Sequence, residues 1–288
     1  MPIDYASLKA WPFAEIEHRY AAKDVILYAL GLGIGGDPLD RAQLRFVYEQ
    51  DLEVVPGFAL VMGYPGFWVM DPRTGLDWKK VLNAEQGVQI FKPLPATGPV
   101  IAQNRVEEIV DKGDGKGAIL YTCRDIFDGD RKELVARVTQ TVLCRGDGGF
   151  DGPVTQPRPA AEPVPQEAPQ LSFDWKTPAQ AALIFRLSGD ANPLHADPSV
   201  AQDAGFPRPI LHGAAVFGIA SYAAVRALCD SQPARLRSLD VRFSAPVFPG
   251  ETIRCEFWRQ GPGAARVRAR VVERDSVVLD RGWVKYDE

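Results

Sequence analysis

The chain has 288 residues, 46% of them hydrophobic, which is enough for one large domain or two of ordinary size with a substantial core. Its formal net charge of −4 is mild and argues against nucleic acid or a membrane surface as the partner, since either favours a strongly basic protein. A small anionic ligand is compatible with this charge because it needs only a local basic patch.

Cysteine usage and the start of the chain indicate a reducing compartment. The four cysteines show no metal-ligand or redox spacing, and they predict buried thiols rather than disulfides. The first residues carry no basic stretch followed by an apolar run, and no apolar run reaches the length of a membrane span. We therefore expect a soluble, cytoplasmic protein that binds no membrane.

The first half of the sequence predicts helical elements followed by an antiparallel meander. Apolar residues at helical spacing predict a helix over 21–32, and the glycines of 31–36 end it. Those glycines do not suit a nucleotide-binding loop, because such a loop follows a strand. Runs rich in Val, Ile, Tyr and Thr predict strands at 86–91, 100–110, 118–126 and 133–144.

A segment rich in Pro, Gly, Ala and Glu, residues 146–170, is predicted to link this half to a second one. The second half repeats the plan of the first, with helices followed by strands. Helices are predicted at 179–187, 197–204 and 213–228, and strands at 238–243, 252–258, 265–273 and 277–286.

Sequence echoes indicate that the two halves are related by duplication. A Gly-Asp…Pro-Leu pattern recurs at 36–40 and 189–195, and a Phe…Pro…Gly pattern recurs at 91–98 and 243–250, at nearly the same separation. The first copy lacks the Asn and His of the second. We therefore predict two repeats, 1–145 and 171–288, of which the second carries the chemistry and the first shapes a pocket.

The segment from Ser188 to His195 is the strongest candidate for a reactive site. It reads Ser-Gly-Asp-Ala-Asn-Pro-Leu-His, and the Asn-Pro pair predicts a loop, which can aim several side chains at one point. His195 can exchange protons near neutral pH, and Asp190 can hold a water or act as a second acid or base. Asn192 offers a donor and an acceptor for orienting that water.

Other interpretations of this loop stay open. Asp190 and Asn192 could simply cap turns while His195 packs. Ser188 could belong to a Ser/His/Asp hydrolase, although it lacks the Gly-x-Ser-x-Gly turn. A metal site is disfavoured because no second His or Cys stands at ligand spacing, so we expect no metal.

Residues 209–213, Pro-Ile-Leu-His-Gly, lead directly into the long apolar helix. The first N–H groups of a helix have no intrahelical partner, and Gly213 lets a ligand approach them closely. A negative charge developing on oxygen would be stabilised there. For His212 a structural role at the start of the helix is favoured. An Asp/His pair with one oxyanion donor suits adding water to, or removing it from, a double bond conjugated to a thioester.

The motif at 188–195 resembles the signature of the (R)-specific enoyl-CoA hydratases of type 2. This is the MaoC-like family that includes the hydratase part of peroxisomal multifunctional enzyme type 2. Further blocks resemble the family in the family's order: 46–49, 85–86, 92–95, 111–113, 209–213 and 243–250. The resemblance implies an α+β double hot-dog fold, in which each half is a long helix wrapped by an antiparallel sheet.

The resemblance also implies roles for individual residues. Asp190 and His195 would be the catalytic pair, Asn192 would position water or thioester, and the Gly213 N–H would bind the thioester oxygen. Glu49 matches a family carboxylate and is a secondary candidate. The implied acyl-CoA contacts are Asn83, Ala84, Lys112, Ala191, Pro193, Leu194 and Phe243.

The resulting hypothesis is reversible syn hydration of trans-2-enoyl-CoA to (R)-3-hydroxyacyl-CoA. No cofactor is implied, because coenzyme A is part of the substrate, and we expect a homodimer. One alternative is a MaoC-like dehydratase for another CoA or acyl-carrier-protein thioester. The other is a hot-dog protein that binds thioesters without catalysis.

Overall fold

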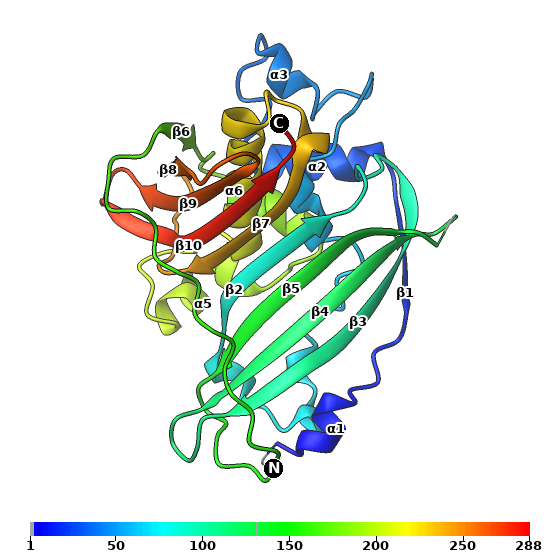
Figure 1. Cartoon of the computed structure of the whole chain (residues 1–288), viewed down its shortest axis with the longest axis vertical. Helices are drawn as coiled ribbons and strands as arrows, with labels where there is room; N and C mark the ends of the chain where they lie inside the picture. The colour runs from blue at the N-terminus through cyan, green and yellow to red at the C-terminus, as the bar shows by residue number, and fades with distance from the viewer. Residues whose placement is uncertain (1–2, 131) are drawn as a thin grey trace.

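One antiparallel sheet of ten strands forms the framework of the protein (Figure 1). The structure is a computed structural model that describes residues 3–130 and 132–288. The strands are β1 (Ile16–Tyr20), β2 (Val81–Ile90), β3 (Gly98–Asp111), β4 (Ala118–Asp128), β5 (Leu134–Cys144), β6 (Leu171–Lys176), β7 (Leu236–Phe243), β8 (Thr252–Arg259), β9 (Ala264–Val271) and β10 (Ser276–Tyr286).

The strand order repeats between the two halves of the chain. Across the sheet it runs β1-β3-β4-β5-β2-β7-β10-β9-β8-β6, so β6 takes the place of β1, β7 that of β2, and so on. β2 and β7 meet in the middle, where they pair from Glu85–Arg242 to Gln89–Ser238. The protein therefore has the expected α+β double hot-dog fold, with the two repeats joined edge to edge.

Helix α6 (Gly213–Leu228) fills the concave side of the second half, and Figure 1 shows it behind β7 and β10. It begins and ends at the predicted residues, and most of its side chains are buried. The other α-helices are α1 (Tyr5–Lys9), α2 (Ala22–Gly31), α3 (Arg41–Leu44), α4 (Ala181–Phe185) and α5 (Pro198–Asp203). Short 3-10 turns are η1 (Pro56–Leu60), η2 (Trp68–Met70), η3 (Pro72–Thr74), η4 (Trp78–Lys80), η5 (Arg186–Ser188), η6 (Pro193–His195) and η7 (Pro233–Arg235).

The larger of two hydrophobic core clusters spans both halves, and the smaller one lies in the first half. The Tyr28 ring of α2 lies 5.3 Å from Phe58 in the same half and 5.4 Å from Phe185 in the other, measured between ring centroids. Aromatic pairs at such spacing add to the stabilisation that burial provides. The α2–α4 contact therefore fixes the first half against the loop that follows α4.

The expectation of a long helix in each half is wrong for the first half. Where α6 stands in the second repeat, the first repeat has the short turn η1 and a loop. The segment from Pro56 to Gly66 contains two prolines and three glycines, and Gly63 and Gly66 adopt left-handed backbone angles. Proline and glycine at this density prevent a continuous helix.

Two strands were not predicted from the sequence, β1 and β6, which occupy the two outer edges of the sheet. Residues 145–170, all of them described, contain no helix or strand, and Figure 1 shows this segment running in front of the sheet between the halves. It is held there by contacts such as the Trp258 Nε1–H donating to the Glu167 carbonyl at 2.8 Å. The repeat boundaries 1–145 and 171–288 stay a prediction.

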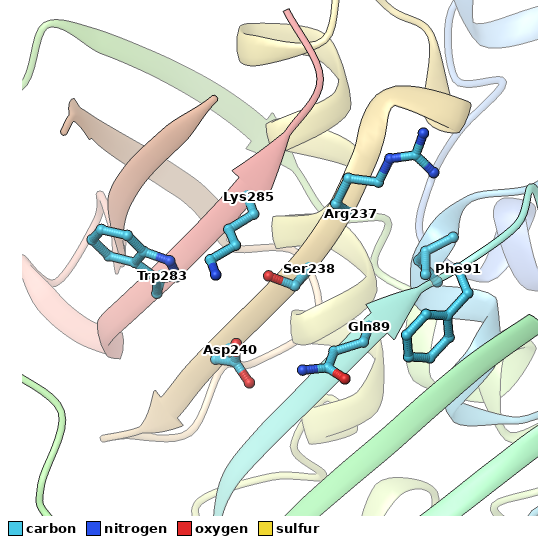
Figure 2. Close-up of a pocket in the computed structure, with 8 residues that line it drawn as sticks. Gln89, Phe91, Arg237, Ser238, Asp240, Trp283 and Lys285 are labelled. Carbon is cyan, nitrogen blue, oxygen red and sulfur yellow. The ribbon is translucent and has the colours of Figure 1, made fainter. Parts of the chain in front are cut away.

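An open hollow of about 430 Å³ lies where β2, β7 and β10 meet (Figure 2). Asp240, Ser238 and Lys285 line it together with Gln89, on the junction of the two repeats. None of the candidate site residues from the sequence lines this hollow. Across the described residues, no helix is long and apolar enough to span a membrane.

Candidate active site

The loop after α4 is built from a series of turns. The Asn192 N–H donates to the Asp190 carboxylate at 3.2 Å, and the Leu194 N–H donates to the Asn192 side-chain oxygen at 3.0 Å. Asn192 thereby caps η6, in which Pro193 is the first residue. Asp190 and Asn192 therefore both cap turns, and these turns hold Asp190 and His195 in place.

His195 ends η6 and is 8% exposed. Its Nδ1 lies 2.9 Å from the Ile210 carbonyl oxygen, which can only accept, so Nδ1 carries the proton. Burial lowers the pKa of His195, although the Ile210 hydrogen bond and the charge of Asp190 act against it. The ring is therefore neutral at physiological pH and presents the lone pair of Nε2 as a base.

His212 lies directly against His195. The two rings stack with centroids 3.7 Å apart and planes at 27°. His212 is 0% exposed, and its Nε2–H donates to the Asp190 carbonyl oxygen at 3.1 Å. Burial, followed by the neighbouring His195, lowers the pKa of His212 to about 4. His212 does stand at the start of α6 as expected, but it also supports both candidate proton-transfer groups.

Asp190, His195 and His212 form one cluster. One potential ligand atom from each side chain lies within 4.8 Å of the others. The spacing along the chain gave no second histidine beside His195, and the fold supplies one from the start of α6. The Ser188 hydroxyl is buried and has no hydrogen-bond partner among the described residues, so it is not bonded to His195 as a hydrolase nucleophile would be.

Gly213 is the first residue of α6 and sits beside the cluster. A Cβ at this position would lie 3.4 Å from the Phe243 ring, so that ring covers one side of the glycine. Glu85 pairs with Arg242 in antiparallel register, and the residues before Glu85 therefore lie beside those after Arg242. The register thus brings Ala84 close to Phe243, whereas a bulge between Asn83 and Glu85 interrupts β2 beyond that point.

The remaining predicted contacts are distributed more widely. Ala191 and Pro193 are exposed and Leu194 is half-buried in the same loop as Asp190. Lys112 is exposed in the turn between β3 and β4. Glu49 is exposed in the loop before η1, and it makes no hydrogen bond or ion pair within the part of the chain that the structure describes. Glu49 is therefore not hydrogen-bonded to the cluster and stays a secondary candidate.

Comparison with known proteins places each half in a domain family. Residues 18–146 match the MFE-2 hydratase 2 N-terminal domain, and residues 158–281 match the MaoC like domain. The chain is 40% identical to 3-hydroxyacyl-thioester dehydratase Y of Mycobacterium tuberculosis, with 93% of each protein covered. It is 36% identical to the peroxisomal enoyl-CoA hydratase 2 of Arabidopsis thaliana, covering 94% of this chain and 92% of that protein.

The solved structures agree with these sequence matches. The crystal structure of a MaoC-like dehydratase from Phytophthora capsici superposes with a TM-score of 0.85 at 32% identity, covering 98% of both chains. Both domain matches occur here in one chain and in the order of the two repeats. The protein therefore belongs to the MaoC-like dehydratase family of hydro-lyases, in the branch whose first half is an MFE-2 hydratase 2 N-terminal domain.

Proposed function

We propose that the protein catalyses the reversible syn hydration of trans-2-enoyl-CoA to (R)-3-hydroxyacyl-CoA. The observation that carries this proposal is the convergence of Asp190 and His195 at the first turn of α6. The names of the relatives, enoyl-CoA hydratase 2 and 3-hydroxyacyl-thioester dehydratase, support the same reaction in its two directions.

The free Nε2 of His195 and the carboxylate of Asp190 supply the two proton-transfer groups that the reaction needs. In hydration, the water oxygen bonds to the β-carbon and one water proton passes to the base. The π-electrons move toward the carbonyl and give an enolate-like state, and the α-carbon then takes up a proton. The two groups form an interacting pair, so proton uptake and release belong to the pair rather than to either residue.

The thioester oxygen gains negative charge in that enolate-like state. The N–H of Gly213 is free of an intrahelical partner and lies at the positive end of the α6 dipole. A preorganised donor of this kind stabilises the transition state more than the ground state. Asn192 retains its amide donor for the water or the thioester, since its side-chain oxygen already accepts the Leu194 N–H.

In this proposal coenzyme A enters as part of the substrate and the reaction uses no separate cofactor. Asn83, Ala84 and Phe243 border the acyl-CoA beside Gly213, and Lys112 contributes a positive charge at the β3–β4 turn. The first repeat, whose central helix is replaced by η1 and a loop, provides room for the acyl group. We further propose that the protein acts in the cytoplasm as a homodimer.

Turnover of crotonyl-CoA by Asp190→Asn and His195→Gln variants tests the assignment. Each should lower kcat by about 100- to 10,000-fold, which is the usual loss when an acid–base group is removed. The thermal midpoint Tm checks that the fold is intact, and chiral analysis of the product checks the (R) configuration. Near-normal turnover in either folded variant would reject the pair.

A panel of thioesters separates the proposal from its alternatives. Preferential turnover of acyl-carrier-protein thioesters would identify a dehydratase of another carrier. Tight crotonyl-CoA binding without turnover in the wild-type protein would identify a thioester-binding protein.

A further inference from the structure

The cluster at the start of α6 has the composition of a metal site. Asp190, His195 and His212 bring together one carboxylate and two imidazoles, and one potential ligand atom from each lies within 4.8 Å of the others. Zinc accepts imidazole nitrogen and carboxylate oxygen, whereas calcium and magnesium prefer oxygen ligands alone. Zinc sites that stay open to a further ligand have three protein ligands of these types. The cluster therefore matches an open zinc site in the number and the kind of its ligands.

Each histidine ring of the cluster keeps one nitrogen that is not bonded to the backbone. The Nδ1 of His195 lies 2.9 Å from the Ile210 carbonyl oxygen, which leaves Nε2, and the Nε2 of His212 donates to the Asp190 carbonyl oxygen at 3.1 Å, which leaves Nδ1. The Nδ1 of His212 is buried and has no hydrogen-bond partner anywhere in residues 3–130 or 132–288. Buried polar groups without a partner are rare in folded proteins. The lone pairs of both rings are thus available to a metal ion.

The hydrogen bonds on the other side of each ring are those of metal-binding histidines. Such a histidine usually donates its second ring N–H to a carbonyl or a carboxylate, which fixes the tautomer and the orientation of the ring. The carbonyl oxygens of Ile210 and Asp190 fill that role in the cluster. His18, the third histidine of the chain, differs because its Nδ1 accepts the Gly63 N–H at 3.1 Å. Only the two stacked rings therefore show the complete pattern.

A small rearrangement of one side chain would bring the ligand atoms to bonding positions. Zinc–nitrogen bonds of about 2.0–2.1 Å in a tetrahedron place neighbouring ligand atoms about 3.3 Å apart, so separations of up to 4.8 Å must shorten by at most about 1.5 Å. The rings of His195 and His212 are buried and already stacked at 3.7 Å. Asp190 is half-buried, and its carboxylate accepts the Asn192 N–H at 3.2 Å. Rotation of the Asp190 side chain therefore supplies most of the adjustment.

We propose that Asp190, His195 and His212 bind one zinc ion, and that this ion inhibits the enzyme. Zinc takes the lone pair of His195 Nε2 and an oxygen of Asp190, which are the atoms that transfer protons in the proposed hydration. The binding site stands on the geometry of the cluster, whereas the inhibition rests on the proposed function. An ion in this place also occupies the position of the reacting water, so zinc and the thioester substrate exclude each other.

Calorimetric titration of the whole protein with zinc chloride at neutral pH tests the site directly. The wild-type protein should bind one ion per chain, and Tm should rise with zinc because the metal binds the folded state. Magnesium chloride should give no binding, since two of the three ligands are imidazoles. His212→Phe keeps an aromatic ring in the stack and should weaken zinc binding at least about 10-fold. His18→Gln is the matched control, because it removes a histidine outside the cluster, and it should bind zinc as the wild type does.

A second titration, in the presence of saturating butyryl-CoA, tests the exclusion of substrate. This thioester has no double bond to hydrate, and it should weaken zinc binding at least about 10-fold if both occupy one site. Unchanged zinc affinity with butyryl-CoA bound would overturn the inhibition.

The outcomes for the site do not depend on turnover. Absence of saturable zinc binding, or equal affinity in the wild type and in His212→Phe, would overturn the site and leave the hydratase proposal standing. Failure of the wild-type protein to hydrate any enoyl thioester would remove the hydratase proposal, while the zinc titration would still decide whether the site exists. If His212→Phe does not fold, Asp190→Asn replaces it, since it removes the charged ligand at nearly constant size and should weaken zinc binding to a similar extent.

Discussion

The His195 and His212 rings stack at 3.7 Å, and each ring has one nitrogen bound to a backbone carbonyl of a different loop segment. His195 is bound to Ile210 and His212 to Asp190, so the two hydrogen bonds cross between the Asp190 loop and the start of α6. These two hydrogen bonds fix the tautomer of each histidine ring and leave the other nitrogen of each ring without a hydrogen bond to the backbone. It fixes the two proposed proton-transfer groups more tightly than either loop could alone.

The first prediction concerns stability at acid pH. The pKa of His212 falls from its ordinary value of 6.5 to about 4 on folding, so the folded protein binds fewer protons than the unfolded chain between these values. The neutral His212 ring therefore makes its full contribution to the free energy of unfolding above pH 6.5. As the pH falls toward 4 that contribution is lost, and the free energy of unfolding decreases by about 3 kcal/mol. Urea unfolding between pH 7 and pH 4 should give a shallower decline for His212→Gln than for wild type. Parallel curves for the two proteins would show that His212 is not the titrating group.

The second prediction concerns the pH dependence of turnover. A base must be neutral to accept a proton, and burial lowers the pKa of His195. The acid limb of kcat/KM for crotonyl-CoA should therefore have its midpoint below 6.5, the ordinary histidine value, and activity should be retained as the pH falls to that point. A midpoint above 6.5 would contradict the environment described for His195.

The third prediction contrasts two glycines of α6. A Cβ at Gly213 would meet only the Phe243 ring at 3.4 Å, an ordinary contact, whereas at Gly218 it would lie 2.5 Å from the Tyr28 hydroxyl and 2.8 Å from Leu32. Gly218→Ala should thus destabilise the protein by about 1–3 kcal/mol through overpacking. Gly213→Ala should keep Tm within a few degrees and lower kcat/KM about 10-fold or more, because the methyl group obstructs the oxyanion donor. The reverse pattern would remove Gly213 from the proposed site.

The fourth prediction concerns metal ions. The ligand atoms of Asp190, His195 and His212 are mutually within 4.8 Å, and carboxylate with imidazole is a donor set that suits zinc. Added zinc should inhibit crotonyl-CoA hydration, and EDTA should restore it. His212→Phe keeps an aromatic ring and removes a ligand, so residual activity of this variant should need at least about 10-fold more zinc for half inhibition. Equal zinc sensitivity in both proteins would place the inhibitory site elsewhere.

Sequence patterns predicted the elements with strong local signals. α6 was predicted at both ends because a long apolar run begins at Gly213, and the inner strands were predicted from their β-branched and aromatic content. β1 has only five residues and carries His18 at its central position, so it gave no clear alternation of apolar and polar residues. β6 alternates as well, but it is short and directly follows the linker rich in Pro, Gly, Ala and Glu, so its pattern does not stand out.

The parts of the site that were not predicted depend on tertiary packing. The stack of His212 on His195 joins segments whose spacing along the chain carries no metal or catalytic signature, and only the α6 start brings them together. A contact of this kind depends on which segments the fold brings together, and the spacing of residues along the chain does not show it.

The junction of β2 and β7 has a consequence for how the chain can be divided. These two strands meet in the interior of one sheet, so removing either repeat would leave a long row of unsatisfied backbone donors and acceptors on the other. An isolated half would tend to pair with further copies through that open edge and aggregate. A truncated protein that contains only the second repeat, with the Asp190 loop, should therefore be less soluble than the whole chain.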